Sequence, residues 1–239
     1  KVDDQNGKKV VTYNEKDYLS FVGEQSFSWS YAKFPYLKSI GWKGCIDGQD
    51  SGVYKVGPLA RINASAGFST ELADEACRRM VEFLGKPIHA SMSYHWARLI
   101  EILHMAELIT EIARDESITS NDILDLNGAK QNVGVGVVEA PRGTLIHHYE
   151  ADENMITTRV NIVVPTTVNN ASINLEIKRV AQSLIRNNEV PKEVLTRIEM
   201  AFRAYDPCIA CSVHSLSGRT PLRLLIYRNN GNLIKEVKQ

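Results

Sequence analysis

Residues 91–114 carry apolar side chains at steps of three and four residues, over a longer stretch than anywhere else in the chain. This spacing matches the α-helical turn of about 3.6 residues and predicts one long amphipathic helix. Its apolar stripe consists of Trp96, Leu99, Ile100, Leu103, Ala106, Ile109 and Ile112. Further helices are predicted over residues 70–84, 171–186 and 191–202, with Thr70 as an N-cap and Pro191 in a first turn.

Other segments favour short strands. Residues up to about 66 are rich in Gly, Pro and aromatic residues, which indicates strands and turns, with the aromatic run 27–36 packed against a core. Short strands are predicted over 133–138 and 159–164, on either side of a loop. Apolar runs at 222–227 and 233–237 flank an Asn-Gly pair, which indicates a β-hairpin. The expected fold is therefore α+β and mainly helical, one domain with a C-terminal β-hairpin tail.

Composition excludes several classes of function. The chain has 239 residues with 28 basic and 28 acidic side chains, so its net charge of zero predicts no binding to nucleic acid or anionic membranes. No apolar run approaches the roughly 20 residues that a membrane-spanning helix needs. Four cysteines are too few for a disulfide scaffold, which favours the reducing cytoplasm. Because the chain starts without Met, we expect a processed or partial product.

The most distinctive local pattern is a C-x-x-C followed by a histidine, in residues 205–214. The thiolates of Cys208 and Cys211 are spaced to bind one metal ion, and His214 offers another donor nearby. A thioredoxin-like pair expects a βαβ setting, and a structural zinc site needs four ligands. From spacing alone, metal binding and a pair of inert buried cysteines both remain open.

Three further segments carry polar residues in an ordered setting. Pro141 and Gly143 bracket Arg142, which predicts a tight loop that directs the guanidinium toward an anionic ligand or a dry pocket. The commoner role of such an arginine is to cap a helix or pair with a carboxylate. An apolar strand ending at Val164-Pro165-Thr166-Thr167 indicates only a buried strand that reaches a turn. On the long helix, the row His95, Arg98 and Glu101 predicts an internal ion-pair network.

Taken in order, these segments resemble the C-terminal part of the large subunit of a nickel–iron hydrogenase. The resemblance rests on Glu139-Ala140-Pro141-Arg142-Gly143, Val164-Pro165-Thr166-Thr167 and the run from Asp206 to His214, with the 95–101 segment upstream. It covers the chain from about residue 57 onward. The region of Gly41 and Trp42 is similar to the soluble, cytoplasmic, multi-subunit branch, including methyl-viologen-reducing enzymes.

The resemblance implies metal ligands. Cys208 matches a terminal nickel ligand, and Cys211 matches a thiolate that bridges nickel to an iron carrying cyanide and carbon monoxide. His214 and the backbone carbonyl of Ile162 match the ligands of a magnesium or iron ion beside that centre.

The resemblance also implies the surroundings of the centre. Arg142 matches the guanidinium over the open metal position, where dihydrogen is split heterolytically. Asp206 and Pro141 match its neighbours, and Thr166 matches the hydroxyl that hydrogen-bonds a cyanide. Electrons would leave through an iron–sulfur small subunit, because this chain has no spare cysteines to hold a cluster.

The chain departs from the family in lacking an R-x-C-G-x-C motif, which supplies the other two cysteine ligands. Cys45 and Cys77 lack that context and receive no ligand role. We therefore expect a partial or split large subunit that is inactive alone and needs a partner carrying the N-terminal part. Residues 1–214 would form the C-terminal portion of the large-subunit domain. Residues 215–239 would be a maturation peptide removed by a dedicated protease, or a tail that is never cut.

Two other classes of function stay in view. Relatives in respiratory complexes use this fold as a non-catalytic scaffold, but they have lost the cysteine pairs. A small thiol-redox or zinc-binding module would bind zinc without a partner, and it leaves the Arg142 loop and the tail unexplained.

Overall fold

The computed structural model describes residues 1–48, 50–121, 123–124, 130–187, 189–213, 223–228 and 230–238. Within these residues the chain forms helices and small antiparallel sheets, so the mixed class of helix and sheet is confirmed. The chain divides into two compact units. Unit 1 contains residues 1–19 and 56–163, and unit 2 contains residues 20–55 and 164–239.

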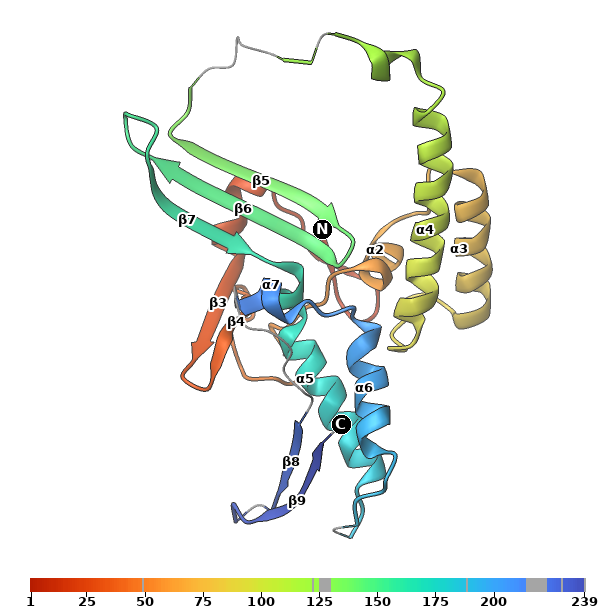
Figure 1. The fold of residues 1–239 in the computed structure, drawn as a ribbon, viewed down its shortest axis with the longest axis vertical. Helices are drawn as coiled ribbons and strands as arrows, with labels where there is room; N and C mark the ends of the chain where they lie inside the picture. The colour runs from red at the N-terminus through yellow and green to blue at the C-terminus, as the bar shows by residue number, and fades with distance from the viewer. Residues whose placement is uncertain are drawn as a thin grey trace. The chain divides into compact units, whose positions relative to one another are not determined.

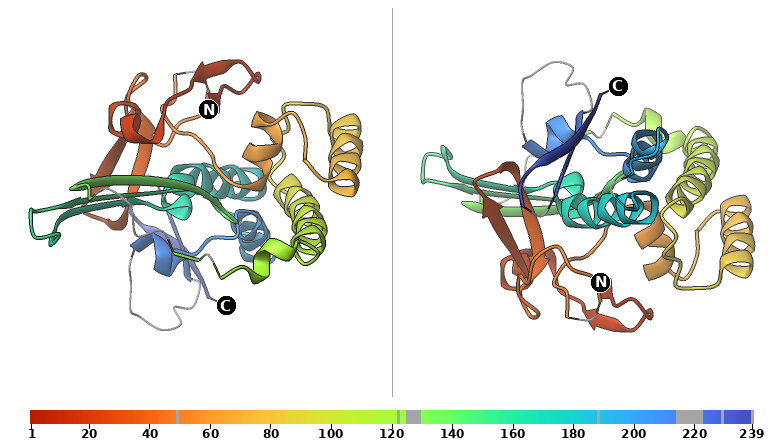
Figure 2. Two further views of the ribbon diagram at one scale, coloured as in Figure 1. Left: turned by 90° about the horizontal axis from the view of Figure 1, so that it is seen from above. Right: turned by 90° about the horizontal axis from the view of Figure 1, so that it is seen from below.

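The helices of unit 1 are α2 (Pro58–Ala64), α3 (Glu71–Leu84) and α4 (Ser93–Ile112). Helices α3 and α4 lie side by side, and α2 packs on α4 (Figures 1 and 2). Helix α3 begins directly after Thr70, as predicted, but the Thr70 hydroxyl bonds to Nδ1 of His104. The free N–H groups at the start of α3 instead donate to the Glu107 carboxylate, from Leu72 at 3.0 Å and Ala73 at 2.9 Å.

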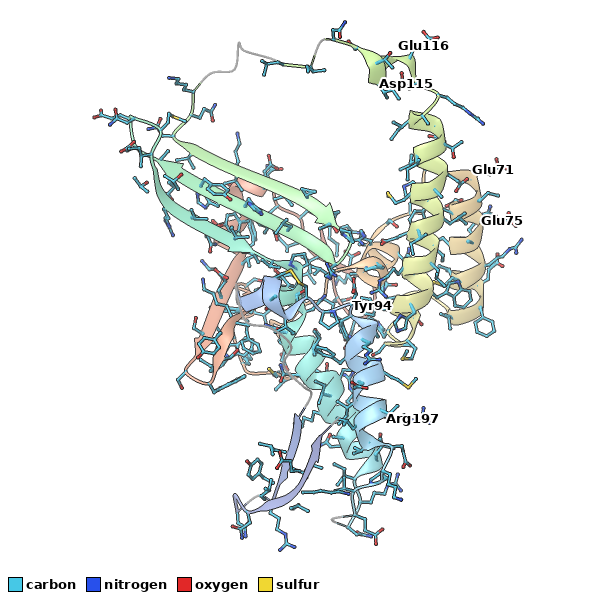
Figure 3. All side chains as sticks on the ribbon, in the orientation of Figure 1. Glu71, Glu75, Tyr94, Asp115, Glu116 and Arg197 are labelled. Atoms are coloured by element: carbon cyan, nitrogen blue, oxygen red, sulfur yellow. A yellow bond between two sulfur atoms is a disulfide. The ribbon has the colours of Figure 1, made fainter. Side chains whose placement is uncertain are left out.

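Helix α4 packs through a different face from its predicted apolar stripe. Tyr94, Ala97 and Ile100 are buried, whereas Leu99 is 65% exposed and Ile109 is 66% exposed. Figure 3 shows Tyr94 near the N-terminal end of α4, where its hydroxyl donates to the Val56 carbonyl at 3.4 Å. The helix is therefore apolar on two sides, one packed against its neighbours and one exposed.

Unit 1 also contains a three-stranded antiparallel sheet in the order β5 (Val133–Ala140), β6 (Gly143–Ala151) and β7 (Thr157–Val163). The two predicted strands are confirmed as β5 and β7. The predicted loop between them is wrong for residues 143–151, which form the central strand, because the chain reverses within two residues at the tip of the β5–β6 hairpin.

Smaller elements of unit 1 are β1 (Val2–Asp3), β2 (Lys9–Val11), η1 (Glu15–Asp17) and η2 (Glu116–Thr119), the last capped by Asp115 (Figure 3). Helix α1 (Tyr18–Phe21) joins the two units along the chain.

Unit 2 is built around a long helix. Helix α5 (Pro165–Leu184) packs against α6 (Val194–Ala204) and against β4 (Ser30–Leu37), which pairs with β3 (Val22–Phe27). The predicted helix at 171–186 begins earlier, because Pro165 occupies its first turn and lacks the N–H that a helix start leaves unpaired. The predicted helix at 191–202 begins later, at Val194.

Two short elements complete unit 2: helix α7 (Ile209–Val213) and a hairpin of β8 (Arg223–Tyr227) and β9 (Leu233–Lys238). In the aromatic run 27–36, Phe34 is buried against Phe27 and Trp29, but Tyr31 is exposed.

Among the helices of the described residues, none has both the length and the apolar character needed to cross a membrane.

Candidate functional site

The predicted site residues divide between the two units. Unit 1 holds Pro141, Arg142 and Ile162, and unit 2 holds Thr166, Asp206, Cys208 and Cys211. Ile162 lies one residue before the end of β7, opposite His147 of β6. His214 lies outside the described residues.

Cys208 and Cys211 lie at the start of α7 with their side chains on the same side of the turn. Their Cα atoms are 5.3 Å apart and their sulfurs are joined in a disulfide. The backbone N–H of Cys211 also donates to Sγ of Cys208 at 3.3 Å. Cys208 is half-buried and Cys211 is exposed. Reduction of this pair gives two adjacent thiolates, which are soft ligands suited to nickel and iron.

The chain turns sharply between α6 and the cysteine pair. Asp206 has a φ of +50°, and its N–H donates to the Arg203 carbonyl at 2.9 Å. Asp tolerates this left-handed conformation better than most residues, because its short polar side chain can bond locally. Pro207 follows and prevents α6 from continuing. Asp206 and Pro207 therefore set the direction of the backbone that leads into Cys208.

Thr166 supports the cysteine pair from the first turn of α5. Its side chain is 2% exposed, and its Oγ1 accepts the Cys208 N–H at 3.2 Å. Because a hydroxyl that accepts one hydrogen bond still has its own hydrogen to donate, Thr166 has a donor left for a second acceptor near Cys208.

A buried polar cluster holds α7 against α5. The Thr167 hydroxyl lies 3.2 Å from that of Ser212, and the Asn170 amide donates to the same Ser212 hydroxyl at 3.3 Å. All three side chains are buried. This cluster was not predicted from the sequence. A signal for it exists, because polar residues that occur in pairs in a buried helix need hydrogen-bond partners inside the protein.

Arg142 lies at the tip of the β5–β6 hairpin, where Pro141 and Arg142 form a two-residue connection between paired Ala140 and Gly143. The predicted tight loop is therefore confirmed. Gly143 has a φ of +132°, and a Cβ at that position would lie 2.7 Å from the Gly57 nitrogen. A Cβ on Gly57 would in turn lie 2.9 Å from the Arg142 carbonyl oxygen. Only glycine fits at both positions, and their close contact fixes the tip against the start of α2.

Arg61 of α2, which was not predicted from the sequence, binds this tip from inside unit 1. Its Nε and Nη2 donate to the two oxygens of Glu101 at 2.6 and 2.7 Å, and Nη1 donates to Glu139 at 2.8 Å. Its Nη groups also donate to the carbonyls of Ala140 and Pro141, both at 3.0 Å. Of the row expected along α4, Arg98 lies 3.3 Å from Nδ1 of His95, but the Glu101 carboxylate pairs with Arg61 of another helix.

The two other cysteines, Cys45 and Cys77, lie outside the Cys208–Cys211 pair and the β5–β6 hairpin tip. Cys77 is buried within α3, and Cys45 precedes α2 in the chain. Burial raises the pKa of both thiols, which disfavours the thiolate that binds metal. Within the described ranges, His, Cys, Asp and Glu nowhere form a group of three or more able to hold a metal ion. Among the described residues, Cys208 and Cys211 could therefore supply two thiolate ligands to a metal centre.

Comparison with known proteins places this chain in a family. Residues 5–214 match the family model for nickel-dependent hydrogenases, and the chain belongs to that family. It is 47% identical over 237 residues to an iron-sulfur subunit of the F420-non-reducing hydrogenase of Archaeoglobus profundus, covering 98% of this chain and 49% of that protein. It is 39% identical to the NAD-reducing hydrogenase HoxS subunit beta of Cupriavidus necator, covering 95% of this chain and 46% of that protein.

The fold agrees with that assignment. A crystal structure of an NAD+-reducing [NiFe]-hydrogenase in the H2-reduced state superposes with a TM-score of 0.76 and 40% sequence identity. The match covers 84% of this chain and 43% of the other. The chain therefore has the large-subunit fold of a nickel–iron hydrogenase, and it spans about half the length of these relatives.

Proposed function

We propose that this chain forms the C-terminal portion of a nickel–iron hydrogenase large subunit, which catalyses the reversible oxidation of dihydrogen to two protons and two electrons. The observation that carries the proposal is the Cys208–Cys211 pair, with adjacent sulfurs and the buried Thr166 hydroxyl beside it. The family match extends through both cysteines. Soft thiolates at this spacing suit a nickel–iron centre better than a hard oxygen-liganded ion.

In this proposal, the thiolates of Cys208 and Cys211 would hold the nickel and an iron that carries cyanide and carbon monoxide. His214 and the Ile162 carbonyl would be ligands of a magnesium or iron ion. The centre supplies the Lewis acidity and the redox capacity for splitting dihydrogen. The described residues would provide two of its thiolates, and the remaining ligands would come from the part of the large-subunit fold that this sequence does not cover.

The residues around the centre hold small ligands and protons. As the resemblance to the family implies, Arg142, Pro141 and Asp206 would be the residues around the centre, where the Arg142 guanidinium would donate hydrogen bonds. The Cys208 thiolate would be the base that takes the proton when dihydrogen is split, and the Arg142 guanidinium, which has donors but no acceptor, would act as a hydrogen-bond donor. The Thr166 hydroxyl accepts a hydrogen bond from the Cys208 N–H and keeps its own hydrogen, which it would donate to a cyanide ligand. Fixed donors of this kind are effective where water is excluded, because little reorganisation is then needed.

Two protein partners follow from this function. An iron–sulfur small subunit would accept the electrons, and a polypeptide with the unmatched half of the large-subunit fold would complete the centre. The exposed apolar side of α4, centred on Leu99 and Ile109, supports the second partner. A helix with apolar residues on two sides is usually covered by other protein segments on both sides.

The tail would act in assembly. We propose that residues 215–239 are removed by a maturation protease after metal insertion in the cytoplasm. The β8–β9 hairpin supports this proposal as a compact unit that follows the cysteine pair in sequence. The intact mass of the protein from metal-loaded complex tests it: a chain that ends at residue 214 agrees, and one that retains residue 239 contradicts it.

A cysteine comparison tests the function as a whole. The complex is purified anaerobically with Cys208→Ser, and with Cys77→Ser as a matched control outside the site. We expect the first variant to lose nickel and hydrogen-dependent reduction of methyl viologen, while the second retains both. Equal nickel in the two variants would overturn the proposal. Stoichiometric zinc bound without partners would favour a zinc module, and an active complex whose chain lacks nickel would favour a scaffold.

A further inference from the structure

Arg61 uses all of its hydrogen-bonding capacity on one small region. A guanidinium has five N–H bonds, and those of Arg61 are directed to Glu101 twice, to Glu139 once and to two backbone carbonyls. Its side chain is 24% exposed, and that of Glu101 is 15% exposed. Burial lowers the pKa of Arg61, but hydrogen bonds and charges from Glu101 and Glu139 more than offset it, so the net shift is upward.

The two carbonyls are those that determine where Arg142 lies. The Pro141 carbonyl belongs to the peptide plane immediately before Arg142, and Arg61 Nη2 fixes that plane at 3.0 Å. The Ala140 carbonyl, bound by Nη1, fixes the preceding plane. On the other side of Arg142, Gly143 is held against Gly57. The backbone of Arg142 is thus fixed from both directions by residues 57–61.

The anchor of Arg61 is separate from the tip. Its bidentate contact with Glu101 reaches α4, a 20-residue helix, and planar paired contacts of this kind fix orientation as well as distance. A lysine has one compact ammonium group and cannot reproduce this fork. The geometry therefore depends on arginine itself and not only on a positive charge.

We propose that Arg61 is a positioning residue that sets the orientation of the Arg142 guanidinium by fixing the peptide planes of the hairpin tip. The inference rests on the proposed function, since it assigns Arg142 to the reaction. A displacement of about 1 Å in a group close to the chemistry can reduce a rate about 100-fold. Loss of the Arg61 fork should therefore slow the reaction and leave metal binding intact.

The test uses Arg61→Lys in the purified, metal-loaded complex, with Arg179→Lys as the matched control. Arg179 also contacts two carboxylates, Asp47 and Glu176, but it lies in unit 2. Three quantities are measured: nickel per chain, amide hydrogen exchange over residues 140–144, and the rate of H2/D2O exchange per nickel. Glu101→Gln serves as a second variant that weakens the anchor and leaves both tip carbonyls in place.

We expect Arg61→Lys to keep its nickel, to exchange the tip amides at least tenfold faster, and to lose at least tenfold in rate per nickel. Arg61→Lys combined with Arg142→Lys should be little slower than Arg142→Lys alone, because both changes act on one group. Glu101→Gln should show a smaller loss of the same kind.

The outcomes separate this inference from the proposed function. If Arg142→Lys slows the reaction and Arg61→Lys leaves rate and tip exchange unchanged, the positioning role is wrong. If Arg142→Lys itself leaves the rate unchanged, the role of Arg142 in the proposed function fails. If Arg61→Lys fails to fold, Glu101→Gln decides, since unchanged exchange and rate in that variant contradict the inference.

Discussion

The Tyr18 hydroxyl lies 3.0 Å from Nδ1 of His148, in the interior of unit 1. The Asn161 amide donates to the same hydroxyl at 2.9 Å, so this hydroxyl bonds both side chains. Nε2 of His148 lies 3.6 Å from a Glu150 oxygen. Tyr18 thus joins the N-terminal segment to two strands of the β5–β6–β7 sheet.

Replacing Tyr18 with Phe should destabilise unit 1. The ring remains, but Nδ1 of His148 and the Asn161 amide lose their shared partner in a buried site. Leaving buried polar groups unpaired costs about 1–3 kcal/mol in the free energy of unfolding. Urea unfolding measures the change. Tyr31→Phe is the control, because Tyr31 is 96% exposed and its substitution should have no effect.

Glu107 should make the stability of the α3–α4 pair depend on pH. Burial raises the pKa of its carboxyl, but hydrogen bonds from Leu72, Thr70 and Ala73 more than offset it and lower the pKa overall. A lowered pKa contributes stability above the ordinary glutamate value and loses it as the pH falls through the shifted value.

The melting temperature of Glu107→Gln should therefore lie below that of the unmodified protein at neutral pH. The difference should narrow as the pH falls to about 4 and below. Thermal unfolding by circular dichroism across this range measures it. A difference that is constant with pH would mean that the carboxylate charge does not cap α3.

The two apolar sides of α4 should respond differently to truncation. Ile100 is 3% exposed, and Ile100→Ala should cost about 2–5 kcal/mol in the free energy of unfolding. Its neighbour Leu99 is 65% exposed, so Leu99→Ala should change that free energy by only about 0.5 kcal/mol. Denaturant unfolding of the isolated chain compares them, and equal losses would show that the Leu99 side is already covered.

A methyl group at the hairpin tip should be poorly tolerated. Gly143→Ala introduces a Cβ 2.7 Å from the Gly57 nitrogen at a φ of +132°, and should destabilise by about 1–3 kcal/mol. Gly136→Ala is the matched control in the same hairpin, because a Cβ there has no neighbour within 4 Å. Thermal unfolding of both variants tests this. Equal melting temperatures would argue against close packing of the tip.

Local patterns predicted the elements whose signals are local. Helix α4 was predicted from periodicity, helix α3 from Thr70 as its N-cap, and the Arg142 turn from Pro141 and Gly143 on either side of it. Strand β6 was missed, because a reversal within two residues leaves no stretch of loop-forming sequence. Helix α5 was predicted too short, because Pro165 follows strand β7 directly and the sequence there indicates the end of a strand.

The stripe on α4 illustrates a different limit. Periodicity identifies apolar positions but not which of them are covered, since this depends on neighbours elsewhere in the chain. Arg61 was missed for a similar reason. Its partners Glu101 and Glu139 are 40 and 78 residues away in sequence, and no spacing rule connects positions so far apart.

The division of the chain also has a consequence for the order of events during synthesis. The β3–β4 hairpin leaves the ribosome before its packing partner α5, which comes only after residues 56–163 have been made. At about 5–20 residues per second, this delay lasts roughly 5–20 s. During that interval the apolar side of the β3–β4 hairpin has no α5 to cover it. We therefore expect a chaperone to bind nascent chains at this stage.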